Sequence, residues 1–198
     1  MKRDYIGRID KKIQSGDERR SIMREEVHVM LSEEQVEAKI KEMAEQISKE
    51  YEGKTLHLIC VLKGSVFFCT ELAKHLTVPV TMDFMAASSY GDDTKSSGQL
   101  KIKKDLDESI EGLHCLLVED IVDSGNTLAR TKIMLLGRKP ASLKLCTLLD
   151  KPARRETEVE VDYTGFTIPD KFVVGYGLDY AQRYRNLPYV GVLEFVEE

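Results

Sequence analysis

The feature that most constrains the fold is a series of short, apolar segments separated by helical patterns. Each segment has the length of one strand, and the segments cover residues 55–62, 78–87, 114–120, 142–150 and 171–177. Almost wholly apolar strands are typical of a sheet that is covered on both faces. The patterns between them have helical spacing: one runs from a capping-box pattern at Ser32–Gln35 to a stop at Gly53, and the others cover residues 65–76 and 127–136. This alternation predicts an α/β domain with a mostly parallel, five-stranded sheet flanked by helices.

Composition and charge exclude several classes of protein. A chain of 198 residues fits a single domain that can bury its own core. With 42% hydrophobic residues, 32% charged residues and a net charge of -5, bulk charge does not favour nucleic-acid binding. The four cysteines lack metal-ligand spacing, so we expect buried, reduced thiols. No apolar stretch reaches the roughly 20 residues that span a bilayer, and the charged start argues against a signal peptide. We therefore expect a cytoplasmic protein that binds no membrane.

The stretch "CLLVEDIVDSGNTL" (115–128) combines a buried strand, three acids and a turn that begins a helix. Gly125 permits a tight turn, and Ser124 and Thr127 can donate hydroxyl groups beside the first N–H groups of the helix. Together with the helix dipole, these groups predict a site for one phosphate group. The loop lacks the Walker pattern, so a nucleotide polyphosphate is not expected.

Two of the acids, Glu119 and Asp120, precede this turn. Free carboxylates would repel a bare phosphate, but they can accept hydrogen bonds from a vicinal diol or bind Mg²⁺ together with sugar oxygens. A phosphate beside a diol describes a metal-bound ribose 5-phosphate. An acidic loop that only caps a helix is the structural alternative. In an open parallel sheet, ligands bind at the carboxyl ends of strands, where this stretch lies.

The segment "VEDIVDSGNTL" resembles the phosphoribosyl-pyrophosphate signature of the type I phosphoribosyltransferases. Over nearly its whole length, the chain is similar to the hypoxanthine-guanine phosphoribosyltransferase family. The supporting motifs stand in the order of that family: "LKGS" (62–65), "SSYG" (88–91), "LLDKPARR" (148–155) and "IPDKFVVGYGLDYAQRYRNLPY" (168–189). The resemblance implies the type I fold, with a core over about 32–177 and a small hood made from about 1–31 and 178–198.

The resemblance also implies the reaction. The 5-phosphoribosyl group passes from phosphoribosyl pyrophosphate to N9 of hypoxanthine or guanine, with Mg²⁺ as cofactor. The products are the purine nucleoside monophosphate and pyrophosphate, which is a step of purine salvage. Members of the family are homodimers or homotetramers. The choice among hypoxanthine, guanine and xanthine stays open.

Several residue roles follow from the resemblance alone. Lys63 and Gly64 match a pyrophosphate loop, often with a non-proline cis peptide, which here lies between Leu62 and Lys63. Asp179 matches a metal ligand, beside Glu119 and Asp120. Arg185 matches a second pyrophosphate contact.

The resemblance places the purine base among three further residues. Lys151 matches the lysine that contacts O6, and as a pure donor it prefers a carbonyl to an amine. Phe172 matches the ring that stacks on the base, and Val173 offers its backbone to the purine edge. Asp123 matches the acid/base residue beside N7.

The lid and one turn residue complete the expected site. Ser89 and Tyr90 match the pair on a catalytic loop, and the polar composition of residues 88–102 independently predicts a mobile loop or exposed hairpin. Asn126 lies in the substrate-binding turn, at a position that varies among family members.

Two other classes compete with an enzyme. A nucleotide-responsive regulator on the same fold would need a basic face or a DNA-binding segment. A receiver domain would need its acids on separate strand ends, whereas here they share one loop.

Overall fold

A computed structural model of the chain describes residues 23–89 and 100–197. Its centre is a six-stranded sheet in the order β4-β3-β2-β5-β6-β7. The strands are β2 (Leu56–Val61), β3 (Val80–Ser89), β4 (Leu100–Lys104), β5 (His114–Val122), β6 (Ser142–Asp150) and β7 (Tyr163–Thr167). All neighbours pair in parallel except β3 and β4, which are antiparallel.

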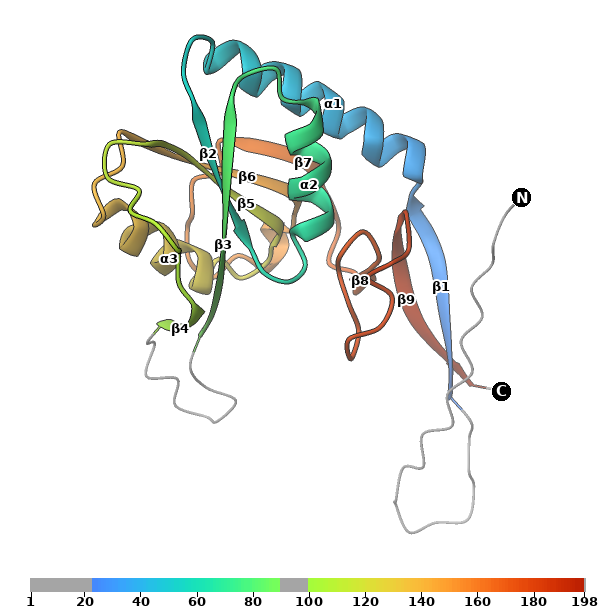
Figure 1. Cartoon of the computed structure of the whole chain (residues 1–198). Helices are drawn as coiled ribbons and strands as arrows, with labels where there is room; N and C mark the ends of the chain where they lie inside the picture. The colour runs from blue at the N-terminus through green and yellow to red at the C-terminus, as the bar shows by residue number, and fades with distance from the viewer. Residues whose placement is uncertain (1–22, 90–99, 198) are drawn as a thin grey trace.

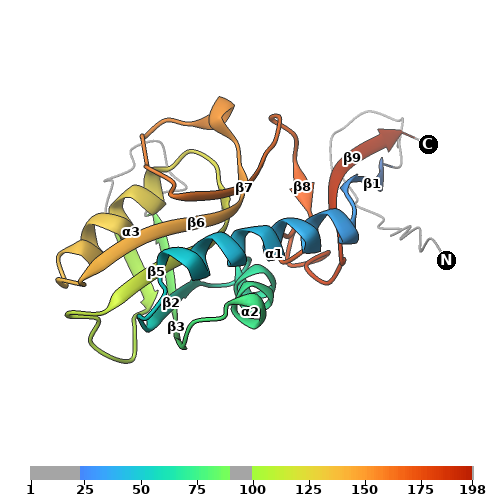
Figure 2. The same cartoon turned by 90° about the horizontal axis from the view of Figure 1, so that it is seen from above.

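Helices cover both faces of this sheet (Figures 1 and 2). The helices α1 (Glu33–Glu50) and α2 (Val66–His75) contribute to one apolar core with the sheet, and α3 (Asn126–Leu136) contributes to the other. The central strands are therefore buried on both sides, which explains why their sequences are almost continuously apolar. The expected α/β class with a mostly parallel, helix-flanked sheet is confirmed.

A second, smaller sheet stands beside the first (Figure 1). It has the order β1-β9-β8 and is antiparallel, with β1 (Met23–Leu31), β8 (Val173–Val174) and β9 (Val190–Glu197). We call this sheet, with the loop 175–189, the hood. It brings a segment that precedes the core together with segments that follow it.

The expected five-stranded sheet differs from the observed sheet in three of its strands. The segment 171–177 supplies only β8, and β8 belongs to the hood rather than to the main sheet. The place beside β6 is taken by β7, which lies in a segment that reads as a polar connection. Its burial is mixed because β7 is an edge strand with one neighbour. The sixth strand is β4, on the opposite edge.

The helix boundaries follow local sequence signals. Ser32 caps α1 in a capping box, in which the Gln35 N–H donates to Ser32 Oγ and the Ser32 N–H donates to Gln35 Oε1. Gly137 ends α3 as expected. In the described part of the chain, no helix has the length and apolarity that crossing a membrane requires.

Candidate active site

The phosphate loop, residues 124–127, joins the end of β5 to α3. Gly125 has a φ of 81° and is the N-cap of α3, so the turn uses the left-handed conformation that glycine adopts without strain. The Asn126 N–H donates to Ser124 Oγ over 3.4 Å. The first turn of α3 holds no acidic side chain. This geometry presents the positive end of the helix dipole at the carboxyl edge of the sheet.

Glu119 and Asp120 lie on β5, directly before this loop. Burial, the Asp120 carboxylate and the Cys60 thiol raise the pKa of Glu119 well above its usual value. Burial likewise raises the pKa of Asp120 to about 6, although the Ile121 N–H donates to its Oδ1 over 2.8 Å. Among the described residues, none donates a hydrogen bond to the buried Glu119 Oε2. Such a pair is suited to a ligand that brings positive charge or hydroxyl donors.

The expected pyrophosphate loop follows β2 and lies against Asp120. The Leu62–Lys63 peptide is cis, as the resemblance implies. A Cβ atom added at Gly64 would lie 1.6 Å from Asp120 Oδ2, so only glycine leaves room for that carboxylate. Ser65 Oγ donates to the Val61 carbonyl over 2.5 Å and holds the turn closed.

The hood reaches this loop through residues 177–185. A Cβ atom at Gly177 would lie 1.9 Å from the Gly64 carbonyl, so the two backbones touch. Arg185 pairs with Asp179 over 2.7 Å and donates to the Gly177 carbonyl over 2.6 Å. The Lys63 ammonium donates to Gln182 Oε1 over 3.2 Å. Sequence reasoning missed Gln182, because a contact across 119 residues leaves no local pattern.

The expected base-binding residues lie at the ends of β6 and β8. Lys151 is buried, and its N–H donates to the Val122 carbonyl over 2.9 Å, which ties the end of β6 to β5. Phe172 is 53% exposed, with its ring edge-on to Tyr180 at 5.7 Å, so one face is free for stacking. Val173 is buried in the hood sheet.

Asp123 has arginine neighbours that sequence reasoning did not assign. Asp123 Oδ1 accepts no hydrogen bond from any described residue but lies 3.4 Å from Arg154 Nε. Arg155 donates to the Asp123 carbonyl over 3.1 Å and pairs with Asp150. The pair of arginines in "KPARR" was the available signal, but no pattern in the sequence connects these arginines to Asp123.

The expected catalytic pair, Ser89 and Tyr90, lies where the first described segment of the chain ends. Ser89 is the last residue of β3. Tyr90 and the rest of 90–99 lie outside the described residues. The described ends of the predicted loop 88–102 belong to the antiparallel strands β3 and β4.

A pocket of about 190 Å³ joins the acids to the phosphate loop. Its polar lining comes from Glu119, Asp123, the phosphate loop and Thr131, and its apolar lining comes from the ends of β2, β3 and β5 and from α3. The structure therefore brings into one concave site the phosphate loop and two of the three acids that the sequence singled out.

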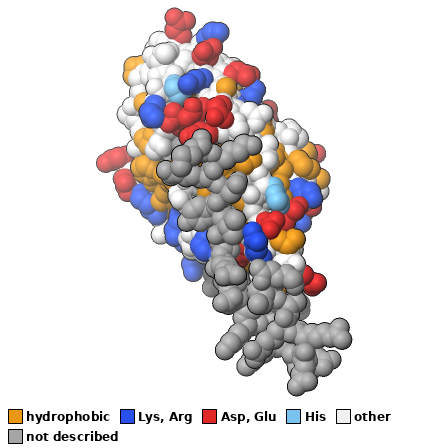
Figure 3. Space-filling model, turned by 90° about the vertical axis from the view of Figure 1, so that its right-hand side faces the viewer, with side chains coloured by type: hydrophobic (Ala, Val, Ile, Leu, Met, Phe, Trp, Pro, Cys, Tyr) orange, Lys and Arg blue, Asp and Glu red, His pale blue; other side chains and the backbone are white. Residues whose placement is uncertain are grey.

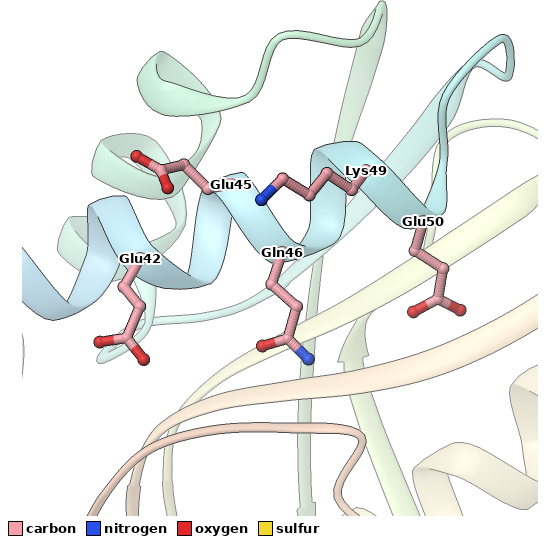
Figure 4. Close-up of a pocket in the computed structure, with 5 residues that line it drawn as sticks. All are labelled: Glu42, Glu45, Gln46, Lys49 and Glu50. Carbon is pink, nitrogen blue, oxygen red and sulfur yellow. The ribbon is translucent and has the colours of Figure 1, made fainter.

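A wider hollow of about 530 Å³ lies along α1 and is a poor match to the same chemistry (Figure 4). All of its lining residues come from that helix: Glu42, Glu45, Gln46, Lys49 and Glu50. Three carboxylates against one ammonium would repel a phosphate group. The hollow also lacks a helix N-terminus and a strand end.

The donor set fits a divalent cation that shares its ligands with a substrate. No group of three or more potential metal-binding side chains occurs in 23–89 and 100–197, so Glu119, Asp120 and Asp179 do not form a cage of protein ligands. Mg²⁺ usually takes one or two carboxylates and completes its shell with water and substrate oxygens. The unpartnered Glu119 oxygen meets that requirement.

Comparison with known proteins gives the same answer as the site. The phosphoribosyl transferase domain family matches residues 30–181. Hypoxanthine phosphoribosyltransferase from Salmonella typhimurium is 50% identical over 178 residues, which cover 89% of this chain and 100% of that protein. Hypoxanthine-guanine phosphoribosyltransferase from Bacillus subtilis is 51% identical over 166 residues, covering 84% and 92%. A crystal structure of such an enzyme from Bacillus anthracis has a TM-score of 0.79 at 46% identity, covering 84% of this chain and 98% of that one.

A parallel sheet that presents a phosphate loop and an acidic pair at its carboxyl edge is the architecture of this class, and the chain belongs to the phosphoribosyltransferase family. Within that class, the curated relatives and the solved structure described above are hypoxanthine or hypoxanthine-guanine phosphoribosyltransferases. The resemblance identified from the sequence motifs is confirmed.

Proposed function

We propose that the protein is a purine-salvage enzyme that transfers 5-phosphoribosyl from phosphoribosyl pyrophosphate to N9 of hypoxanthine or guanine. The observation that carries this proposal is the single pocket in which the phosphate loop adjoins Glu119. The loop is suited to the 5-phosphate, and the acids are suited to the ribose hydroxyls. This arrangement matches a phosphorylated sugar better than a polyphosphate or a free base.

The residues beside this pocket would bind the pyrophosphate and the purine base. Lys63 and Gly64 would bind pyrophosphate, with Arg185 approaching from the hood. Lys151, which directly follows β6, would donate to the O6 atom of the base. Its ammonium group can only donate hydrogen bonds, so it is suited to a carbonyl oxygen. Phe172 would stack on the base, and the Val173 backbone would meet its edge.

Asp123 would act as the acid/base residue. As N9 attacks C1 of the sugar, the bond from C1 to the pyrophosphate oxygen breaks and its electron pair leaves with pyrophosphate. The proton of the attacking purine passes to the Asp123 carboxylate. Negative charge from Glu119 and Asp120 would stabilise the oxocarbenium-like sugar, as carboxylates do in glycoside hydrolysis.

We propose Mg²⁺ as the cofactor, which Glu119, Asp120 and Asp179 would hold together with oxygens of the substrate. When bound, Mg²⁺ neutralises charge on the leaving pyrophosphate. The raised pKa values of the acidic pair describe the protein without that positive charge. Ser89 and Tyr90 would close over the reaction and exclude water.

The proposal is tested by initial rates with phosphoribosyl pyrophosphate, Mg²⁺ and each of four bases. We expect nucleoside monophosphate formation with hypoxanthine, guanine or both, and none with adenine, because a lysine donor at O6 finds no acceptor on an amine. The xanthine rate measures how far the pocket admits a second carbonyl. Turnover of adenine with none of the 6-oxopurines would contradict the proposal.

A nucleotide-responsive regulator is the second candidate, and it would need a basic face for nucleic acid. Where Figure 3 shows described residues, acidic and basic side chains are interspersed on this face. Salt-sensitive binding of the purified protein to DNA or RNA would revive this reading.

The remaining expectations concern assembly and location. We propose that the chain forms a homodimer or homotetramer, on the resemblance alone, and light scattering of the purified protein tests this. The cytoplasmic location stays a prediction.

A further inference from the structure

The segment after Lys151 turns back onto the phosphate loop and closes it from outside. It runs through the short helix η1 (Pro152–Arg154) to Glu156 and Thr157. The N–H groups of Glu156 and Thr157 both donate to the Ser124 carbonyl, over 2.9 and 3.0 Å. Two donors on one carbonyl fix the first residue of the phosphate loop against a segment about 30 positions later in the chain.

The side chain of Asn126 joins the same two residues. Its Nδ2 donates to Glu156 Oε2 over 2.6 Å, and its Oδ1 accepts from Thr157 Oγ1 over 2.5 Å. Both ends of the amide are therefore occupied within the protein. The structure assigns the Asn126 side chain to holding the loop, which leaves its backbone for a substrate.

Backbone packing leaves the loop no room to shift toward this segment. A Cβ atom added at Gly125 would lie 2.3 Å from the Thr157 carbonyl oxygen. A loop that is held by four hydrogen bonds and touches its support is preorganised, so its N–H groups keep their spacing before a ligand arrives.

We propose that Glu156 and Thr157 form a clasp that positions the phosphate loop, with Thr157 as a positioning residue for the 5-phosphate. This inference rests on the proposed function, because it takes the loop as the 5-phosphate site. None of the four hydrogen bonds of the clasp involves Lys63 or Gly64, so we expect that loosening it weakens binding of the 5-phosphate and leaves binding of pyrophosphate unchanged. A clasp that only stabilised the fold would affect both ligands alike.

The test uses Thr157→Val, which keeps the shape of the side chain and removes its donor, and Thr157→Ser, which restores the donor. We expect the Kd for inosine monophosphate and the KM for phosphoribosyl pyrophosphate to rise by about five- to twentyfold in Thr157→Val, since small misplacements of a binding group have effects of this order. The inhibition constant of Mg²⁺-pyrophosphate stays within about twofold, and Thr157→Ser recovers most of the loss.

Glu156→Ala supplies a second variant, and Glu158→Gln, a change at a neighbouring exposed carboxylate, supplies the control. Unchanged nucleotide affinity in Thr157→Val and Glu156→Ala overturns the clasp, and so does an equal loss of nucleotide and pyrophosphate affinity. If Thr157→Val does not fold, Glu156→Ala decides between these outcomes. Failure of the proposed function can be told apart from failure of the clasp. If the proposed function is wrong, the unmodified protein neither binds inosine monophosphate nor produces it.

Discussion

The carboxyl group of Asp120 lies where burial favours its neutral form, whereas the proposed reaction needs its charge. The Arg185 guanidinium lowers its pKa, but burial outweighs this and the Asp179 carboxylate adds to the rise. Gly64 is required directly beside it, because any side chain there would overlap the carboxylate. The site is therefore arranged to bind a ligand, and this arrangement lowers the stability of the unliganded protein.

Asp120→Asn tests that conflict. The folded state binds the Asp120 proton more tightly than the unfolded state, since the pKa rises from 3.8 to about 6. The free energy of unfolding therefore falls as pH rises from about 4 to about 6 and stays lower above that range. In a metal-free buffer near pH 8, we expect Asp120→Asn to be more stable by on the order of 1–3 kcal/mol, and near pH 4 to match the unmodified protein.

The measurement is thermal unfolding across this pH range, with Asp170→Asn, a change at an exposed carboxylate, as control. Asp120→Asn should also lose phosphoribosyl transfer. A variant that is less stable near pH 8 would show that the charged form is not disfavoured.

Asp123→Asn tests the acid/base role. An asparagine keeps the size of the side chain but cannot accept the purine proton, so we expect kcat with hypoxanthine to fall by about 10²- to 10⁴-fold. The Kd for inosine monophosphate should change little, because the product carries no proton to transfer. A kcat within about threefold of the unmodified enzyme would remove Asp123 from the mechanism.

At the scale of elements, the site is built from the ends of strands, whereas the capping box at Ser32 stabilises helix α1. Ser32→Ala removes one bond of the capping box of α1, which packs on the sheet face opposite α3. We expect about 1 kcal/mol of lost stability and a fall in Tm of about 2–4 °C, with kcat and KM unchanged. Ser32→Asn, which keeps a capping acceptor, should restore the Tm. A change in KM for phosphoribosyl pyrophosphate would show that α1 acts on the site.

Elements with a strong local pattern could be predicted, and those held by distant partners could not. The strands β2, β5 and β6 and the start of α3 follow from apolar runs, Gly125 and a hydroxyl turn. In contrast, β7 was missed because it is an edge strand with mixed burial, and β8 has two residues whose partners lie on β9.

The same distinction holds within the site. The ligand class could be inferred from Glu119, Asp120 and the Ser124–Thr127 turn, because all of them lie on one short stretch. The contacts of Thr157 with Asn126 and of Gln182 with Lys63 join residues 31 and 119 positions apart. No local sequence pattern around these residues predicts such a contact.

At the scale of the whole molecule, a buried carboxylate on β1 joins the hood sheet to the hood loop that reaches the site. Glu25 on β1 is 5% exposed and accepts from Arg183 over 2.8 Å and from the Tyr184 hydroxyl over 2.5 Å. Both partners lie in the loop that carries Asp179 and Arg185. The first described strand of the chain therefore helps to position groups proposed to meet pyrophosphate.

Glu25→Gln tests this long-range support. The variant removes the charge while keeping an acceptor, and we expect about 1–3 kcal/mol of lost stability because one partner of a largely buried pair is left uncompensated. The inhibition constant of pyrophosphate should rise by about three- to tenfold, with the KM for hypoxanthine within about twofold. Glu26→Gln, a change at a partly exposed neighbour on the same strand, is the control. Equal effects on base and pyrophosphate would contradict a role confined to the hood loop.

The most direct measurement is a crystal structure of the protein soaked with inosine monophosphate and Mg²⁺. The phosphate should lie about 3 Å from the N–H groups of residues 124–127, with the ribose hydroxyls at Glu119 and Asp120 and the base between Phe172 and Lys151. A phosphate bound anywhere else, with the 124–127 amides facing water, would contradict the account.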